Sequence, residues 1–374
     1  MGVPLVWSAL SGKPSSPWLW SRPIDLLVIA GVGSMVFIVL AIPASYLWAG
    51  FGAAMITVFF HLSVVCNGPH YAATYQIVIR ERHRRRRNWM WLAVTAPAVL
   101  AALMAVGFWP TVLLAPFTRL YLTLSPHHYA AQHFGLAALY SARRGRPLDP
   151  GEKRLLRFSF LGIGGFMMLM ANTLVADSNE GLVGIPASGY IAQGGLPPFT
   201  YYIGLGFVAV SLGLVWLADR RLRRRTHHGL DGIVWLLFFV NFLWFVVPNL
   251  RLPGDTNPWV PPVLGAALIA AIPFFHCAQY LAVAGHRVRG TGPVRPIVML
   301  AVLVVGGFAI FFGMARFTSQ MTPLDIARAT LLVDAVFNLH HFLLDAIIWR
   351  QPKAPSVSPV PAPATWGPRT LGSN

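Results

Sequence analysis

Histidine is the residue type with the clearest potential for chemistry in this 374-residue chain. Four of its 12 histidines lie in basic segments, and the other eight lie in long apolar stretches. Those eight are His61, His70, His127, His128, His133, His276, His340 and His341. A single histidine in an apolar stretch is usually a hydrogen-bonded packing residue, but eight in one chain require another explanation.

The spacing of these histidines from the basic ends of their stretches indicates a common depth. In four stretches a histidine lies ten residues before a basic residue: His70 before Arg80, His133 before Arg143, His276 before His286 and His340 before Arg350. Ten helical residues rise about 15 Å, which is half the thickness of a bilayer's hydrocarbon core. We therefore expect four histidines from four helices to lie at one level near the middle of the membrane.

Four neutral imidazoles at one level are the donor set that proteins use for Fe, Cu, Zn and Ni. The sequence therefore predicts a buried transition-metal site near mid-membrane. Its predicted ligands are His70, His133, His276 and His340.

Other histidines in the same stretches compete for these roles. His128 is an alternative to His133 as a ligand, and His341 is an alternative to His340. His61, His127 and His128 are also candidate ligands for a second metal or for a different ligand set.

Polar residues beside the histidines are candidates for orienting the imidazoles. On a helix, Asp334, Asn338, His341 and Asp345 fall within one narrow stripe. Asp345 lies four residues after His341, which favours His341 as the histidine that a carboxylate orients, whereas depth favours His340. Further candidates for this role are Tyr71, Gln132, Gln279 and Tyr280.

The elements that must position these side chains are membrane-spanning helices. A hydrophobic content of 56%, a charged content of 11% and a mean hydropathy of +0.59 exceed what soluble domains show. We expect an all-α, polytopic bundle of about ten transmembrane helices, each long enough to cross about 30 Å of hydrocarbon. They are predicted near residues 24–46, 52–80, 89–109, 118–142, 154–175, 199–218, 230–249, 259–285, 295–315 and 322–349.

Basic residues predict the orientation of this bundle. Of the 29 Lys and Arg residues, only Arg119, Arg251, Arg316 and Arg328 fall on one side of the predicted spans. The positive-inside rule then places both termini in the cytoplasm, and we expect a bacterial-type inner (cell) membrane. Orientation and lipid headgroups account for the net charge of +17, so nucleic acid is not an expected partner.

Three segments make up the predicted chain. Residues 1–23 form a cytoplasmic N-terminal segment, and residues 24–350 form the transmembrane helical domain with the metal site. Residues 351–374 are rich in proline and are expected to form a disordered cytoplasmic tail, since they cannot build a core.

Four short segments, in chain order, resemble the Brp/Blh family of membrane beta-carotene 15,15'-dioxygenases. That family carries a Pro-His-Gly segment, a His-Phe-Gly segment, a Phe-x-His segment and a terminal Pro-His followed by an apolar run and often Asp. The matching segments are GPHYAATY with His70, QHFGLAAL with His133, FFHCAQY with His276, and LHHFLLD with His340 or His341. The acidic residue that follows the first and second histidines in the family is absent from this chain.

The resemblance implies a membrane enzyme in which four histidines hold non-heme Fe(II) and dioxygen is a co-substrate. In the family, dioxygen adds across the central double bond of beta-carotene and gives two molecules of retinal. We therefore predict an Fe(II)-dependent dioxygenase that cleaves a carotenoid or another lipophilic substrate entering from the bilayer.

Two other classes of protein remain open at this point. A di-metal membrane hydroxylase or desaturase has enough histidines here, although the HxxxH and HxxHH boxes associated with that class are missing. A non-enzymatic haem or metal protein, such as an electron-transfer subunit or a transporter, would use paired axial histidines or a path of carboxylates. Intramembrane carboxylates are few, which disfavours a transporter.

Overall fold

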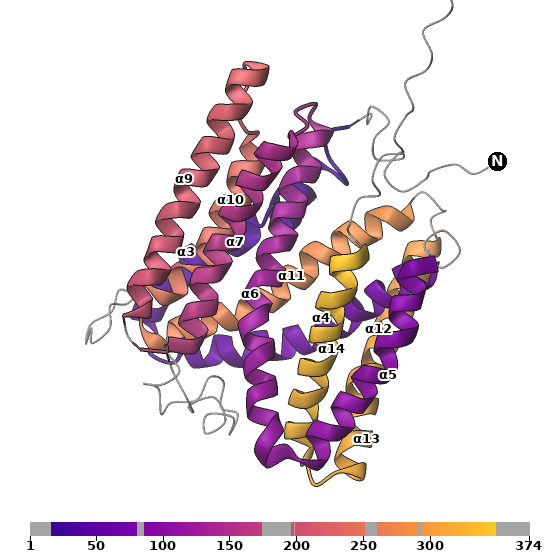
Figure 1. Cartoon of the computed structure of the whole chain (residues 1–374). Coiled ribbons are helices and arrows are strands. Elements are labelled where there is room, and N and C mark those ends of the chain that lie inside the picture. The colour runs from indigo at the N-terminus through magenta and orange to yellow at the C-terminus, as the bar shows by residue number, and fades with distance from the viewer. Residues whose placement is uncertain are drawn as a thin grey trace, which may run out of the picture.

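The structure, a computed structural model, describes residues 16–80, 86–173, 196–197, 199–250, 260–289 and 294–348. The predicted proline-rich tail and the first 15 residues of the N-terminal segment lie outside these ranges. Within them every regular element is a helix (Figure 1). In chain order the helices are α2 (Arg22–Ile24), η1 (Asp25–Ile29), α3 (Val32–Leu47), α4 (Phe51–Arg80), α5 (Arg86–Phe108), α6 (Pro110–Arg143), α7 (Pro150–Thr173), α9 (Thr200–Thr226), α10 (Gly232–Phe245), η4 (Val247–Asn249), α11 (Pro262–Arg289), α12 (Val294–Phe308), η5 (Ala309–Gly313), α13 (Met314–Met321) and α14 (Ile326–Ile348).

The predicted all-helical architecture is confirmed for the described residues. Seven helices are long and apolar enough to cross a membrane, and an eighth span is formed if the bent pair Arg22–Ile29 and Val32–Leu47 counts as one. These eight correspond to eight of the ten predicted stretches. The remaining two stretches fall on α6 and α14, which are 34 and 23 residues long and are not among these candidate spans. The count of ten spans stays a prediction, and these two helices are the ones with paired candidate histidines.

Four helices meet in the middle of the molecule. α4 packs against α11 and α12, and α14 packs against α4, α5, α6 and α13. α6 also packs against α7 and α10, and α7 packs against α9. In Figure 1, α4 and α11 run from side to side, whereas α6 and α14 run from top to bottom. The crossing brings α4, α6, α11 and α14 together, although they lie far apart in the sequence.

Basic helix ends gather at one end of the bundle. Arg225 at the end of α9 forms an ion pair of 2.7 Å with Glu152 in the first turn of α7. Arg144, which follows α6, lies 3.3 Å from Asp231 before α10 and also stacks over Trp18, 4.3 Å from the ring centroid. The described part of the N-terminal segment therefore lies at the same end as two of the basic loops. That this end faces the cytoplasm stays a prediction.

Glycines allow α4 and α12 to touch beside a candidate ligand. A Cβ on Gly307 would lie 2.6 Å from the backbone nitrogen of Pro69 and closer still to the carbonyl carbon of Gly68. The atoms in the way belong to the backbone of α4, so they cannot rotate aside. This contact fixes the backbone directly before His70.

We expect Gly307→Ala to push α12 away from α4 and to weaken both the fold and metal binding. Overpacking of this kind typically costs about 1–3 kcal/mol of stability. Thermal unfolding in detergent will show a lower midpoint for this variant. Gly306→Ala is the matched control, because its Cβ would meet only the Cβ of Ala72, at 4.0 Å. Equal unfolding midpoints for the two variants would contradict the account of this contact.

Candidate metal centre

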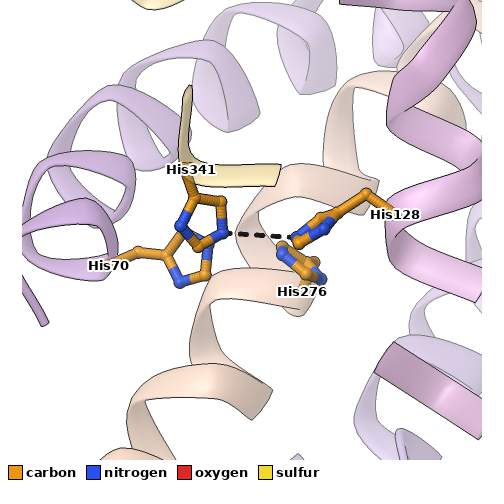
Figure 2. Close-up of side chains that lie close together, drawn as sticks. All are labelled: His70, His128, His276 and His341. Carbon is orange, nitrogen blue, oxygen red and sulfur yellow. Dashed lines mark hydrogen bonds between the residues drawn. The ribbon is translucent and has the colours of Figure 1, made fainter. Parts of the chain in front are cut away.

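Four histidines from four helices converge at the crossing point. They are His70 on α4, His128 on α6, His276 on α11 and His341 on α14. Each offers one ring nitrogen, and the four nitrogens all lie within 4.8 Å of one another. Figure 2 shows the four imidazoles turned toward one another, each from a different helix. All four side chains are buried, so the group is shielded from bulk water.

The four rings form a closed group in contact with one another. The ring centroid of His70 lies 4.3 Å from that of His341 and 5.0 Å from that of His276. The ring centroid of His128 lies 4.9 Å from those of His276 and His341. The Nε2 atoms of His128 and His341 are 3.3 Å apart (Figure 2). Such spacing suits a single small ion between the ring nitrogens.

Unpaired ring nitrogens show that the group suits a metal ion. Both ring nitrogens of His276 and Nδ1 of His70 are buried without a hydrogen-bond partner. A neutral imidazole has one N–H donor and one lone pair, and burying either without a partner costs about 1–3 kcal/mol. A metal ion that accepts the lone pairs removes part of this cost.

A chain of hydrogen bonds orients His341. Its Nδ1 lies 2.9 Å from the hydroxyl of Thr74, and that hydroxyl donates to Oδ1 of Asp345 over 3.3 Å. The Tyr280 hydroxyl lies 2.7 Å from the same threonine and also donates to Oδ1, over 3.3 Å. Because the Thr74 hydroxyl donates to Asp345, it accepts from His341 when Nδ1 carries the proton. The lone pair of His341 is then on Nε2, the nitrogen that faces the other histidines. A metal-ligating histidine usually has its other nitrogen fixed in this way.

Aromatic rings surround the imidazoles. The closest contacts between ring centroids are Tyr280 with His70 at 4.2 Å, Tyr129 with His276 at 4.3 Å, Phe342 with His128 at 4.3 Å and Tyr71 with His341 at 5.2 Å. These rings fix the imidazoles in place and fill the space around them. Tyr71 and Tyr280, both predicted to support the site, therefore lie beside it.

His133, predicted as a ligand, lies outside this group. Its Nδ1 is 3.0 Å from Oδ1 of Asn241 on α10, and its Nε2 is 3.2 Å from the amide nitrogen of Gln279 on α11. The same amide donates to the carbonyl oxygen of Ile29 over 3.0 Å. Because both ring nitrogens have partners, His133 ties three helices together. Its rival His128, five residues earlier, takes the place in the group.

His340, the other predicted ligand outside the group, is also hydrogen-bonded on both sides. Its Nδ1 lies 2.7 Å from the Tyr75 hydroxyl and its Nε2 lies 2.8 Å from the Thr95 hydroxyl. It therefore faces α4 and α5, whereas the neighbouring His341 faces the other three histidines.

The remaining candidate histidines are exposed and are not members of the group. The Nδ1 of His61 is 2.7 Å from the carbonyl oxygen of Thr57 on its own helix, and His127 is also exposed. Within the described residues, the four-histidine group is the one place where three or more His, Cys, Asp or Glu side chains come close enough to hold a metal.

The other predicted supporting residues divide into two sets. Gln132 donates to the carbonyl oxygen of His276 over 3.3 Å and to Oε1 of Gln279 over 3.1 Å, so it acts on the backbone of α11. Asn338 donates to the carbonyl oxygen of Asp334 over 3.0 Å, and the Asp334 carboxylate accepts from Asn67 over 3.5 Å. Asp334 and Asn338 thus belong to a separate polar group, and Asp345 is the acid of the stripe that contacts the histidines.

Two supporting residues were not predicted as part of the site. Thr74 lies four residues after His70 on the same helix face, and this spacing was the available signal. Asn241, the partner of His133, lies on α10 in an apolar segment far from any histidine in the sequence. No sequence pattern connects it to α6.

Comparison with known proteins adds no relative to these observations. No protein-family model, curated protein sequence or solved structure matches the chain. The buried four-histidine group in a helical membrane protein is compatible with metal binding on its own geometry.

Proposed function

We propose that the protein is a membrane oxygenase in which His70, His128, His276 and His341 hold one Fe(II) ion. The observation that supports it is the convergence of four buried ring nitrogens within 4.8 Å of one another. Neutral imidazoles suit Fe, Cu, Zn and Ni alike. The resemblance of GPHYAATY, FFHCAQY and LHHFLLD to segments of the Brp/Blh dioxygenases favours iron and dioxygen.

The resemblance assigns one ligand differently from this proposal. Its His-Phe-Gly segment contains His133, which is hydrogen-bonded on both ring nitrogens. We assign the ligand role to His128 and a positioning role to His133, which holds α6 against α10 and α11. The terminal segment agrees with the proposal through His341, one of the two histidines that the resemblance allows.

A lipophilic polyene, such as a carotenoid, is the proposed substrate. A bound ferrous ion would supply the redox chemistry with dioxygen. The chain's own residues hold the ion without adding charge, orient His341 through Thr74 and keep water away with aromatic rings. In the cleavage, one carbon–carbon double bond breaks and each oxygen atom of dioxygen ends in one carbonyl group. No external reductant is needed.

The geometry disfavours the two other classes of protein. A di-metal enzyme needs a second group of ligands, and the described residues hold a single such group. A haem would have to lie between its axial histidines, but the rings of this group are in contact, with centroids 4.3–5.0 Å apart. One small ion is therefore the better occupant.

The test is turnover by protein loaded anaerobically with Fe(II) in detergent and then supplied with beta-carotene and dioxygen. We expect loss of the visible absorption of the polyene, uptake of dioxygen and a carbonyl product in the mass spectrum. His276→Ala will abolish all three signals. His61→Ala is the matched control, because that histidine is exposed and is not a member of the group. Iron-loaded protein that leaves a panel of carotenoids and other polyene lipids unchanged would contradict the proposal.

A further inference from the structure

Asp345 lies against the four-histidine group with its two carboxylate oxygens in different surroundings. Oδ1 accepts hydrogen bonds of 3.3 Å from Thr74 and from Tyr280. Oδ2 lies 3.4 Å from Nε2 of His341 and 4.0 Å from Nε2 of His128. The side chain is 7% exposed, so the carboxylate is enclosed by the protein.

The side from which Asp345 approaches distinguishes two roles. A carboxylate that only orients a ligand contacts the imidazole nitrogen that points away from the metal. On His341 that nitrogen is Nδ1, and Thr74 already contacts it at 2.9 Å. Oδ2 of Asp345 instead approaches Nε2, the atom that also lies 3.3 Å from Nε2 of His128. The carboxylate therefore lies on the side where the ring nitrogens converge.

Charge gives an independent reason for a carboxylate at this place. Four neutral imidazoles leave a divalent ion with its full charge inside an apolar bundle, and an uncompensated buried charge is costly. Asp334, on the same helix, accepts from Asn67 and belongs to a separate polar group. Oδ2 of Asp345, by contrast, comes within 4.0 Å of a ring nitrogen of His341 and of a ring nitrogen of His128.

We propose that Asp345 is a fifth, anionic ligand of the metal. Oδ2 binds the ion, and Thr74 and Tyr280 hold the carboxylate in place through Oδ1. The site is then a four-histidine, one-carboxylate centre, and one of the ion's two positive charges is compensated within the bundle. This inference rests on the proposed metal site.

The experiment uses the full chain in detergent and Co(II), a divalent probe with a visible spectrum that reports its ligands. Competition with a chelator gives the affinity of the wild type, Asp345→Asn and the matched control Asp334→Asn. Loss of an outer hydrogen-bonding partner typically costs about 10–100-fold in metal affinity, so loss of a ligand will cost more. We expect Asp345→Asn to lose more than about 100-fold and to change the visible spectrum, and Asp334→Asn to match the wild type.

A second measurement does not depend on the variant folding. The infrared difference spectrum of the wild type with and without Co(II) will show a shifted carboxylate stretch, and the same shift will appear in Asp334→Asn. An absent shift, or an Asp345→Asn protein with an unchanged spectrum and an affinity within tenfold of the wild type, would overturn the fifth ligand alone. A wild type that binds no Co(II) would instead overturn the metal site itself.

Discussion

Alanine at His128 will remove the metal, whereas alanine at His133 will leave it in place. The two residues lie five positions apart on α6, which separates them by about 7.5 Å along the helix and about 140° around it. His128 faces the other three histidines, and His133 is bonded to Asn241 and Gln279. Loss of a ligand will lower metal affinity by more than about 100-fold, since even outer partners contribute 10–100-fold.

The measurement is bound metal per folded chain in the monodisperse fraction of each variant. His133→Ala will be less stable, because it removes one hydrogen-bond partner from each of two buried amide groups, at a cost of about 1–3 kcal/mol each. Its affinity will nevertheless stay within about tenfold of the wild type. If His133→Ala loses the metal and His128→Ala retains it, the ligand is His133, the histidine of the segment that matches the family's His-Phe-Gly.

Alanine variants of His341 and His340 will also differ in metal affinity, although the two residues are adjacent in the sequence. Residues one position apart on a helix point about 100° apart. His341 faces the group through Nε2, whereas His340 has the Tyr75 and Thr95 hydroxyls at 2.7 Å and 2.8 Å. We expect His341→Ala to lose more than about 100-fold in metal affinity and His340→Ala to lose less than tenfold.

Thr95→Val provides the control for the second pair. It removes one hydrogen bond to His340 without touching the four-histidine group. Its metal affinity, measured by the same chelator competition, will equal that of the wild type. If Thr95→Val and His340→Ala both lose the metal while His341→Ala retains it, the assignment of His341 is contradicted.

The fold class could be predicted from the sequence because hydropathy acts over whole segments. A run of about twenty apolar residues satisfies its backbone hydrogen bonds in a bilayer by forming a helix. Seven of the predicted stretches are helices long and apolar enough to span it, and the bent pair Arg22–Ile29 and Val32–Leu47 is an eighth if it counts as one span. α6 and α14 are not among these candidate spans, and each carries a pair of candidate histidines.

Depth along the chain was a weaker guide to the site. Counting ten residues from a basic residue assumes that every helix stands at a similar angle to the membrane. α4 and α11 instead cross α6 and α14 (Figure 1). Ten residues on an inclined helix therefore cover less depth than ten residues on an upright one. The count placed His70 and His276 in the predicted site together with His133, but the group forms with His128.

Helix faces were the better guide where they could be used. The stripe of Asp334, Asn338, His341 and Asp345 favoured His341, and this histidine is the one that joins the group. Which helix a face meets was not predictable, because it depends on tertiary packing. The contact of His133 with Asn241 on α10 is an example, since 108 positions separate the two residues.

The most direct test of the central claim is the metal content of the wild-type protein. The protein would be purified in detergent without a histidine tag and loaded anaerobically with Fe(II), and its metals would be counted by mass spectrometry. The four-histidine centre predicts about one iron ion per chain and no haem absorption band. A chain that retains no metal after loading would show that the buried imidazoles of His70, His128, His276 and His341 do not form a metal site.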